Sequence, residues 1–338
     1  MKIDLRSDTV TKPSVEMLEA MMKAEVGDDV FNEDPETNNL ERFAAELFKK
    51  EAALFCSSGT MANQIAIRVH TQPGDEVICD SNSHIFNYET GGLAANSGVQ
   101  ARLLKGNAGK LNVDLIASAV NGDYDWMAKT GLVSLENTVN KAGGTYYSLK
   151  EIIPISNFCR DRQIPLHLDG ARIFNALIEL NELPSDHAAH FNSLSVCLSK
   201  GLGAPVGSLL LGDKLFIKKA RRIRKQFGGG MRQIGYLAAA GKYALQNNIP
   251  RLKEDHARAR IIANALEQFS WVKEINEVLT NIIIFHTENF EINTAVIEKM
   301  QKKNIYVSAF GPSTIRMVTH LDFTDSQLEL LLQALKTI

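Results

Sequence analysis

The chain has 338 residues, and its 37 lysines and arginines nearly balance its 39 aspartates and glutamates, so the net charge is −2 at pH 7. This length fits about two domains with a buried core. The balanced charge excludes recruitment of nucleic acid or an anionic membrane by a global field, so we expect a small-molecule partner, no nucleic acid and no membrane.

No segment predicts secretion or membrane insertion. The first residues lack the apolar core of a signal peptide, and no stretch reaches the roughly 18 apolar residues of a membrane helix. The four cysteines, at positions 56, 79, 159 and 197, form no Cys-x-x-Cys pair and indicate buried thiols in a reducing compartment. We therefore expect a soluble, cytoplasmic protein.

Short apolar segments alternate with amphipathic ones over about three quarters of the chain, which predicts an α/β fold with a mainly parallel sheet. Residues 61–70, for example, carry Ile65, Ala66 and Val69 at helical spacing. The segments that read as strands are 52–56, 76–79, 100–104, 131–135, 164–168, 193–198 and 207–211.

The pattern changes after Asn248. Pro250 opens a charged helix, and the order that follows is a strand at 281–286, a helix at 292–302, strands at 305–310 and 314–319, and a helix from about 325. This order predicts a small α+β domain. We therefore divide the chain into a large domain, 1–248, and a small C-terminal domain, 249–338.

Asp169 and Lys200 each stand where a predicted strand runs into a glycine turn. Ligands of such sheets bind beyond the carboxyl ends of the strands. Pyridoxal phosphate needs both residue types: an amine to attach its aldehyde and a carboxylate to keep its ring nitrogen protonated. The alternative is that Lys200 only marks a solvated strand end.

The turn Ser57-Ser58-Gly59-Thr60 lies between a strand and a helix, where backbone N–H groups and the helix dipole favour a phosphate. An ordinary Ser/Thr helix cap is the alternative interpretation. The Gly-rich dinucleotide fingerprint and the Walker pattern are both missing. A nicotinamide enzyme or a mononucleotide kinase is therefore disfavoured.

Two further residues are candidates near these strand ends. Arg172 follows Asp169 by three residues and either pairs with it or binds the phenolic oxygen of the cofactor or the substrate carboxylate. His84 lies in a loop after the strand at 76–79, where its ring could stack on a pyridine or simply face solvent.

Residues 218–225 place six cations in eight positions, and Arg232 follows. We interpret the run as a solvated helix face, with Lys225 and Arg232 as candidate phosphate ligands across a subunit interface. His187 and His190 lack a His-Glu-x-x-His pattern and a third ligand, so we expect no metal site.

Together these motifs resemble the low-specificity L-threonine aldolases, which belong to the fold-type I (aspartate aminotransferase-like) pyridoxal-phosphate enzymes. The likeness runs from Ile3 to about His320. It is carried by residues 3–11 (IDLRSDTVT), 27–31 (GDDVF), 58–64 (SGTMANQ), 168–172 (LDGAR) and 199–208 (SKGLGAPVGS). The resemblance implies a seven-stranded, mainly parallel sheet with helices on both faces, a homotetramer built from close dimers, and an N-terminal segment that contributes to the active site.

The resemblance also implies roles for single residues. Lys200 attaches pyridoxal 5'-phosphate, Asp169 pairs with its ring nitrogen and His84 stacks on its ring. The phosphate is held by Ser58, Gly59 and Thr60, with Lys225 and Arg232 reaching a neighbour's cofactor. The substrate carboxylate is held by Ser7, Arg172 and Arg316.

One departure concerns the substrate hydroxyl. Many members of the family carry a histidine where this chain has Trp126, and another where it has Val139, and neither side chain can take a proton. We therefore expect Trp126 near the mouth of the pocket, poor discrimination between L-threonine and L-allo-threonine, and His84 through a water, or the cofactor phosphate, as the proton acceptor.

The expected reaction is retro-aldol cleavage of a β-hydroxy-α-amino acid to glycine and an aldehyde. Another pyridoxal-phosphate enzyme on the same scaffold, such as a β-eliminating lyase or a transaminase, is the nearest alternative. A sugar-phosphate or nucleotide-binding protein that uses the turn at 57–60 without covalent chemistry is the alternative from a different class.

Overall fold

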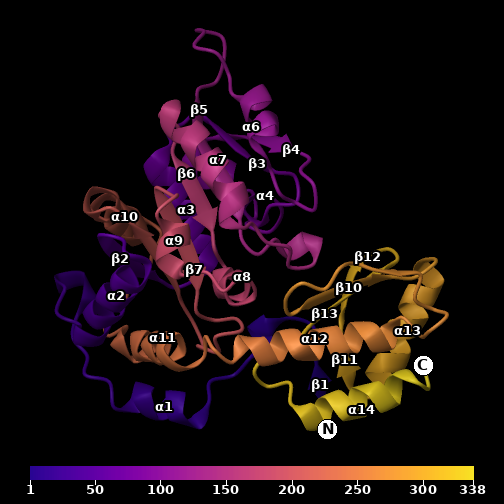
Figure 1. The fold of residues 1–338 in the computed structure, drawn as a ribbon. Coiled ribbons are helices and arrows are strands. Elements are labelled where there is room, and N and C mark those ends of the chain that lie inside the picture. Colours follow the sequence, from indigo (N-terminus) through magenta and orange to yellow (C-terminus); the bar gives the residue numbers. More distant parts are fainter.

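The computed structural model describes residues 1–338 and contains the expected α/β domain (Figure 1). Its seven-stranded sheet has the order β2-β8-β7-β6-β5-β3-β4, and only β8 runs against the other strands. The mainly parallel sheet is thus confirmed. Its strands are β2 Ala52–Cys56, β3 Glu76–Asp80, β4 Gln100–Leu104, β5 Thr130–Glu136, β6 Leu166–Asp169, β7 Ser193–Cys197 and β8 Ser208–Gly212.

Helices cover both faces of this sheet (Figure 1). Helices α3, α5 and α10 pack together on one face, and α2, α7 and α9 pack together on the other. None of the helices is both long and apolar enough to cross a membrane. The helices of this part are α1 Val15–Met22, α2 Pro35–Phe48, α3 Gly59–His70, α4 His84–Asn87, α5 Gly92–Ser97, α6 Val113–Ala119, α7 Leu149–Asp161, α8 Ile173–Leu180, α9 Pro184–Ala188, α10 Lys214–Gln226 and α11 Gly235–Asn247.

Local sequence explains why these elements form where they do. All seven residues of β5 are buried, as expected of a central strand covered by helices on both sides. Asp34 caps α2 by accepting a hydrogen bond from the Thr37 N–H, and Pro35 stands at the first helical position. Ser58 caps α3 in the same way, so the polar turn before α3 is fixed beside the end of β2.

A second core lies in the C-terminal part, to the right in Figure 1. Helices α12 and α14 pack together beside a four-stranded antiparallel sheet of order β12-β13-β10-β9. The elements of this part are α12 Leu252–Leu266, β9 Glu274–Ile275, β10 Ile282–His286, α13 Phe290–Lys302, β11 Ile305–Tyr306, β12 Ser308–Gly311, β13 Thr314–Val318 and α14 Asp325–Leu335.

The prediction of a single strand at 305–310 is wrong, because this segment forms two short strands that pair with different partners. Strand β11 pairs in parallel with the N-terminal strand β1 (Ile3–Asp4), whereas β12 pairs with β13. Ile3 and Leu5 accordingly pack in the second core, although they belong to the range 1–248 that the sequence pattern assigns to the large domain.

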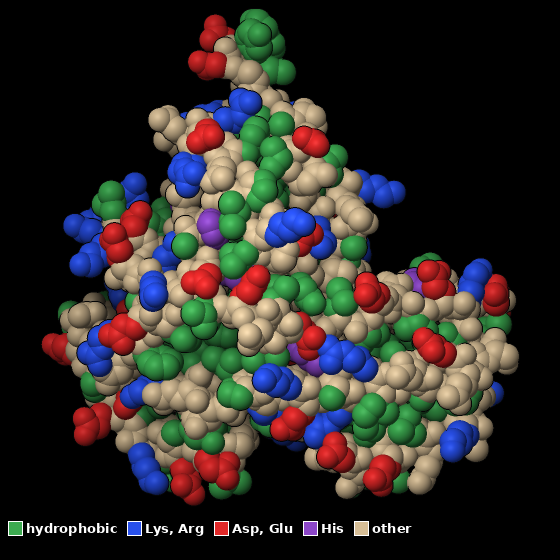
Figure 2. All heavy atoms as spheres, in the orientation of Figure 1, with side chains coloured by type: hydrophobic (Ala, Val, Ile, Leu, Met, Phe, Trp, Pro, Cys, Tyr) green, Lys and Arg blue, Asp and Glu red, His purple; other side chains and the backbone are tan.

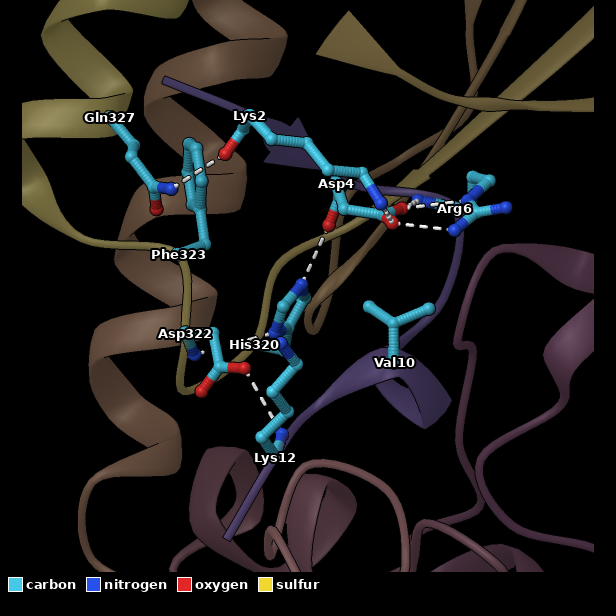
Figure 3. A pocket seen from close by; sticks show the side chains of 9 residues that line it. All are labelled: Lys2, Asp4, Arg6, Val10, Lys12, His320, Asp322, Phe323 and Gln327. Carbon is cyan, nitrogen blue, oxygen red and sulfur yellow. Dashed lines mark hydrogen bonds and ion pairs between the residues drawn. The ribbon is translucent and has the colours of Figure 1, made fainter. Parts of the chain in front are cut away.

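A cavity of about 390 Å³ beside β1 shows how the N-terminal segment is attached (Figure 3). The Asp4 carboxylate binds Lys2 at 3.0 Å and Arg6 at 2.6 Å, and His320 Nε2 donates to the Asp4 carbonyl at 2.7 Å. The two ion pairs stay within the segment, and the His320 bond attaches it to the C-terminal part just before Ser7 and Asp8. The short 3-10 helix Asp8–Val10 is thereby fixed at the edge of the large sheet.

Candidate active site

Three parallel strands end side by side and bring their last residues to one edge of the sheet. Glu136 of β5 stands opposite Asp169 of β6, and Asp169 stands opposite Ser195 of β7. Asp169 is buried and accepts hydrogen bonds from Asn63 Nδ2 at 2.8 Å and from the Ala171 N–H at 3.1 Å. These two bonds fix the position of the Asp169 carboxylate at the sheet edge.

Lys200 follows the end of β7 by three residues and is half-buried, so the expected strand end at Lys200 lies at Cys197 instead. Its ammonium has no hydrogen-bond partner within the chain. Burial alone would raise the pKa of Asp8, but the charge and hydrogen bonds of Arg172 and the charge of Lys200 hold it well below its ordinary value. The amine therefore faces the same region as Asp8.

His84 begins α4 and joins the same cluster. Its backbone N–H donates to Glu136 Oε2 at 2.8 Å, and its Nδ1 lies 3.0 Å from Glu89 Oε1. Burial alone would lower the pKa of His84, yet the bond to Glu89 and the charges of Asp169 and Glu89 raise it overall. Because an ionised Glu89 can only accept, Nδ1 carries a proton and Nε2 is the ring nitrogen left for other partners.

The predicted phosphate turn has the expected position at the start of α3. Ser58 Oγ accepts the Met61 N–H at 3.1 Å, so the ordinary helix-cap role and the phosphate role coexist at Ser58. At Gly59 a Cβ would lie 2.6 Å from Cys197 Sγ, so only glycine lets the turn approach β7 this closely. Thr60 is exposed, and the first N–H groups of a helix have no partner in its own ladder.

Arg172 does not pair with Asp169, and that alternative is wrong. Its Nε and Nη2 atoms each donate to Asp8 at 2.7 Å in a buried two-bond pair, because Arg172 faces the N-terminal 3-10 helix rather than its own strand. The remaining group, Nη1, has no hydrogen-bond partner in the protein. Arg172 therefore keeps a donor for a bound anion.

Arg316, on β13, brings a second guanidinium to this place. It donates to Asn140 Oδ1 at 2.9 Å and to the Arg6 carbonyl at 3.0 Å, while its buried Nε has no partner. Burial, and then the charge of Arg172, lower the pKa of Arg316. Two guanidiniums thus share one carboxylate, Asp8, and an added anion would balance the excess positive charge.

Ser7 lies directly before this 3-10 helix. Its Oγ caps the helix by accepting the Thr9 N–H at 3.2 Å, which places the hydroxyl beside Asp8. The N-terminal strand, the strand ends of the large sheet and β13 thus converge at one site. The chain brings together Ser7, His84, Asp169, Arg172, Lys200 and Arg316.

Two predicted cofactor ligands do not join this cluster within one chain. Lys225, at the end of α10, is exposed, and Arg232 is exposed and paired with Asp28 at 2.9 Å. The exposure of both side chains agrees with binding the cofactor phosphate of another subunit, and that role stays a prediction.

Trp126 does not join this cluster within one chain, and its expected position near the mouth of the pocket stays a prediction. Trp126 is 79% exposed in the loop before β5, stacked on Tyr124 at 4.9 Å. Seven strand residues, about 20 Å, separate this end of β5 from Glu136. Figure 2 shows hydrophobic and acidic side chains gathered on the protrusion that this loop forms at the top of the molecule.

Sequence reasoning missed four residues that the cluster contains: Asp8, Asn63, Glu89 and Glu136. Burial and the charge of Asp169 raise the pKa of Glu136 to about 7. Asp8 and Asn63 fall inside the motifs 3–11 and 58–64 and could have been noticed there. Glu89 has no such signal, because only the fold turns it toward His84.

The chain is similar to known proteins over nearly its whole length. The family described as beta-eliminating lyase matches residues 4–289. The low specificity L-threonine aldolase of Escherichia coli (strain K12) is 44% identical over 328 residues, 96% of each chain. Low-specificity L-threonine aldolase 1 of Arabidopsis thaliana is 40% identical over 333 residues, 96% of this chain and 93% of the plant protein.

Solved structures agree on the fold. Leishmania major threonine aldolase superposes with a TM-score of 0.87 at 24% identity, covering 99% of both chains. Sphingomonas wittichii serine palmitoyltransferase gives 0.77 at 16% identity, covering 99% of this chain and 86% of the other. With a family match over most of its residues and relatives above 40% identity, the chain belongs to the beta-eliminating lyase family and, within it, to the low-specificity L-threonine aldolases.

Proposed function

We propose that this protein is a pyridoxal-5'-phosphate-dependent aldehyde-lyase that cleaves L-threonine, L-allo-threonine and related β-hydroxy-α-amino acids to glycine and an aldehyde. One observation carries the proposal: the buried carboxylate of Asp169 and the unpaired amine of Lys200 follow neighbouring strands at one sheet edge, beside two guanidiniums that share one counter-ion. The names of the relatives, low-specificity L-threonine aldolases, support the choice of reaction.

The residues at this edge fit pyridoxal phosphate. When bound, the cofactor supplies a carbonyl that captures an amine and a protonated ring that accepts an electron pair. Lys200 is the residue that would attach it, and Asp169 would keep its ring nitrogen protonated. The turn Ser58-Gly59-Thr60, at the positive end of α3, would hold the phosphate, and the ring of His84 would lie against the cofactor ring.

The substrate carboxylate has a matching pair of donors. Arg172 offers Nη1 and Arg316 offers its buried Nε, and the two guanidiniums bind the neighbours of Ser7 on either side, the Asp8 carboxylate and the Arg6 carbonyl. Binding one carboxylate here would neutralise the charge that Asp8 alone leaves uncompensated. The same donors would select an α-amino acid over an amine, since an amine without a carboxylate brings no countercharge.

His84 is suited to receive the proton of the β-hydroxyl. Glu89 holds the proton on Nδ1, which leaves Nε2 as the basic atom. The raised pKa of His84 increases its affinity for a proton, so the ring would take the proton directly or through one water. Neither Trp126 nor Val139 is needed for this step.

A β-eliminating lyase acting on serine or tryptophan is the second candidate, and the description of the matching family favours it. Product analysis separates the two. Purified protein with bound cofactor should release glycine and acetaldehyde from threonine, and no pyruvate from serine or indole from tryptophan. Pyruvate or indole without glycine would contradict the proposed reaction and support elimination.

We further propose a homotetramer in which each site is completed by a neighbouring subunit. Exposed apolar side chains support this: Val15, Leu18 and Met22 form one stripe on α1, and Phe31 lies exposed soon after. Lys225 and Arg232 would then reach a neighbour's phosphate, and the protruding loop with Trp126 would pack on another subunit. A cytoplasmic location is supported by the cysteines, which are all free and buried.

A further inference from the structure

Asn63 connects the two carboxylates beneath the proposed site. Its single amide nitrogen donates to Asp169 Oδ2 at 2.8 Å and to Glu89 Oε1 at 3.0 Å, so both of its N–H bonds are used. The same Glu89 oxygen also binds His84 Nδ1 at 3.0 Å. One neutral amide therefore bridges the partner of the cofactor ring nitrogen and the partner of His84.

The orientation of this amide is fixed from its other side. Asn63 Oδ1 accepts from Ser195 Oγ at 2.7 Å and lies 3.2 Å from His167 Nε2. A flipped amide would point its oxygen at two carboxylates and lose every bond on that side. All four hydrogen-bonding positions of Asn63 are thus used in only one orientation.

His167, which is buried, and His70, which is half-buried, complete the support. Because Asn63 Oδ1 accepts, His167 carries its proton on Nε2 and accepts at Nδ1 from Ser193 Oγ, 2.8 Å away. The Ser193 oxygen then accepts from His70 Nε2, also at 2.8 Å. Burial lowers the pKa of His167 to about 4 and that of His70 to about 3, so both rings are neutral, as this chain of bonds requires.

We propose that Asn63 is a positioning residue for the reaction: it holds the carboxylates of Asp169 and Glu89 side by side and so sets the cofactor ring and His84 together. This inference rests on the proposed function. Two neighbouring buried carboxylates repel each other, and without the shared amide nothing would hold the Asp169 and Glu89 side chains in this arrangement. The other charged groups facing the pair, Lys200, Glu136 and His84, do not bridge both carboxylates.

Three variants test the proposal. Asn63→Ala removes both donors, Asn63→Ser keeps one hydroxyl donor, and Asn175→Ala is a matched control. Asn175 is also buried and bonds a histidine, His256, at 2.9 Å, but it touches neither carboxylate. For each we would measure kcat and KM with threonine, the pH titration of the visible absorbance of bound cofactor, thermal unfolding, and the His84 pKa by imidazole NMR of cofactor-free protein.

In Asn63→Ala we expect kcat to fall by about 10- to 100-fold, the usual cost of losing a residue that orients an active-site group, while KM changes less than about threefold. The absorbance titration should shift, and the His84 pKa should fall toward its ordinary value because Glu89 is no longer held against His84 Nδ1. Asn63→Ser should show the same changes at smaller size. Asn175→Ala should show none of them.

A lower kcat accompanied only by lower thermal stability, with unchanged absorbance titration and His84 pKa, would mean a merely structural role and would overturn the proposal. Unchanged kcat in Asn63→Ala would overturn it as well. If Asn63→Ala does not fold, Asn63→Ser decides by the same measurements. The NMR result needs no substrate, so it still tests the bridge if the parent protein cleaves no β-hydroxy amino acid.

Discussion

Glu136 and Asp169 stand opposite each other as the last residues of the adjacent strands β5 and β6, and both are buried. Asp169 accepts from Asn63 Nδ2 and the Ala171 N–H, whereas Glu136 accepts two backbone N–H groups, those of His84 and Asn140. Burial and the neighbouring Asp169 charge raise the pKa of Glu136 to about 7. Glu136 is therefore the member of this pair that titrates near neutrality.

Glu136 should cause the free energy of unfolding to fall as the pH rises from acidic to neutral. Its folded pKa of about 7 lies above the ordinary 4.5, so across this window the folded protein binds more protons than the unfolded chain, and stability falls as pH rises. Replacing Glu136 by Gln removes this pH-dependent contribution to the free energy of unfolding. The free energy of unfolding of the variant relative to the parent should rise by roughly 2–3 kcal/mol from pH 5 to pH 8.

Denaturant unfolding of both proteins at pH 5 and pH 8 measures that difference. Glu46→Gln, at an exposed position of α2, is the control and should leave the pH dependence unchanged. Identical pH dependence in Glu136→Gln and the parent would show that Glu136 keeps an ordinary pKa.

Asp169→Asn should bind the cofactor yet lose about 100-fold or more of kcat, the scale of a lost charge-assisted contact in a transition state. An amide cannot hold the ring proton, and its NH₂ group would also face the NH₂ group of Asn63. Cofactor content and kcat are the two measurements. Near-normal turnover would assign Asp169 a purely structural role.

Arg316→Ala should raise KM for threonine by about 10-fold or more and change kcat less, because the lost guanidinium binds the carboxylate of substrate and transition state alike. Steady-state kinetics measure both constants. Arg258→Ala is the matched control, since Arg258 binds Asp325 at 2.8 Å outside the site. Equal KM values for Arg316→Ala and the parent would remove Arg316 from the substrate site.

Gly59→Ala should weaken cofactor binding, because the added methyl group would lie 2.6 Å from Cys197 Sγ and push the turn away from β7. Cys197→Ala removes that sulfur, so the double variant should recover much of the lost affinity. Cofactor titration of the two single variants and the double variant gives the coupling between the positions. Independent effects of the two changes would show that this contact does not position the turn.

Trp126 should be shielded from solvent in the assembled protein if the protruding loop packs on another subunit. In a Trp271→Phe variant Trp126 is the remaining tryptophan, and its fluorescence reports the loop alone. Quenching by acrylamide should be weak at concentrations where light scattering gives a tetramer. Strong quenching in the tetramer would mean that Trp126 stays as accessible to solvent as it is in one chain, where it is 79% exposed.

Much of the fold could be predicted because its signals are local. Apolar runs flanked by turns located all seven strands of the large sheet, and Asp169 and Lys200 were found because both follow such runs. The division of residues 305–310 between β11 and β12 could not be predicted, since it depends on pairing with β1 about 300 residues earlier.

The site was predictable only in part for the same reason. Pairing with Asp169 was one alternative for Arg172, but Arg172 binds Asp8, which the fold brings from the N-terminus. Asn63 was seen only as part of a helix motif, because its role depends on two carboxylates and a histidine from other elements. Trp126 was placed by resemblance alone, although it precedes the strand predicted at 131–135 and therefore lies at the amino end of β5, opposite to Glu136.

The central claim is that retro-aldol cleavage takes place at this sheet edge and requires Lys200. Measuring the glycine and acetaldehyde formed from L-threonine tests it most directly. The parent with bound cofactor should form the two products in equal amounts. Lys200→Ala should form neither while remaining folded, and Lys242→Ala, which changes a half-buried lysine near Glu36, should behave as the parent. Equal product formation by Lys200→Ala and the parent would contradict the account.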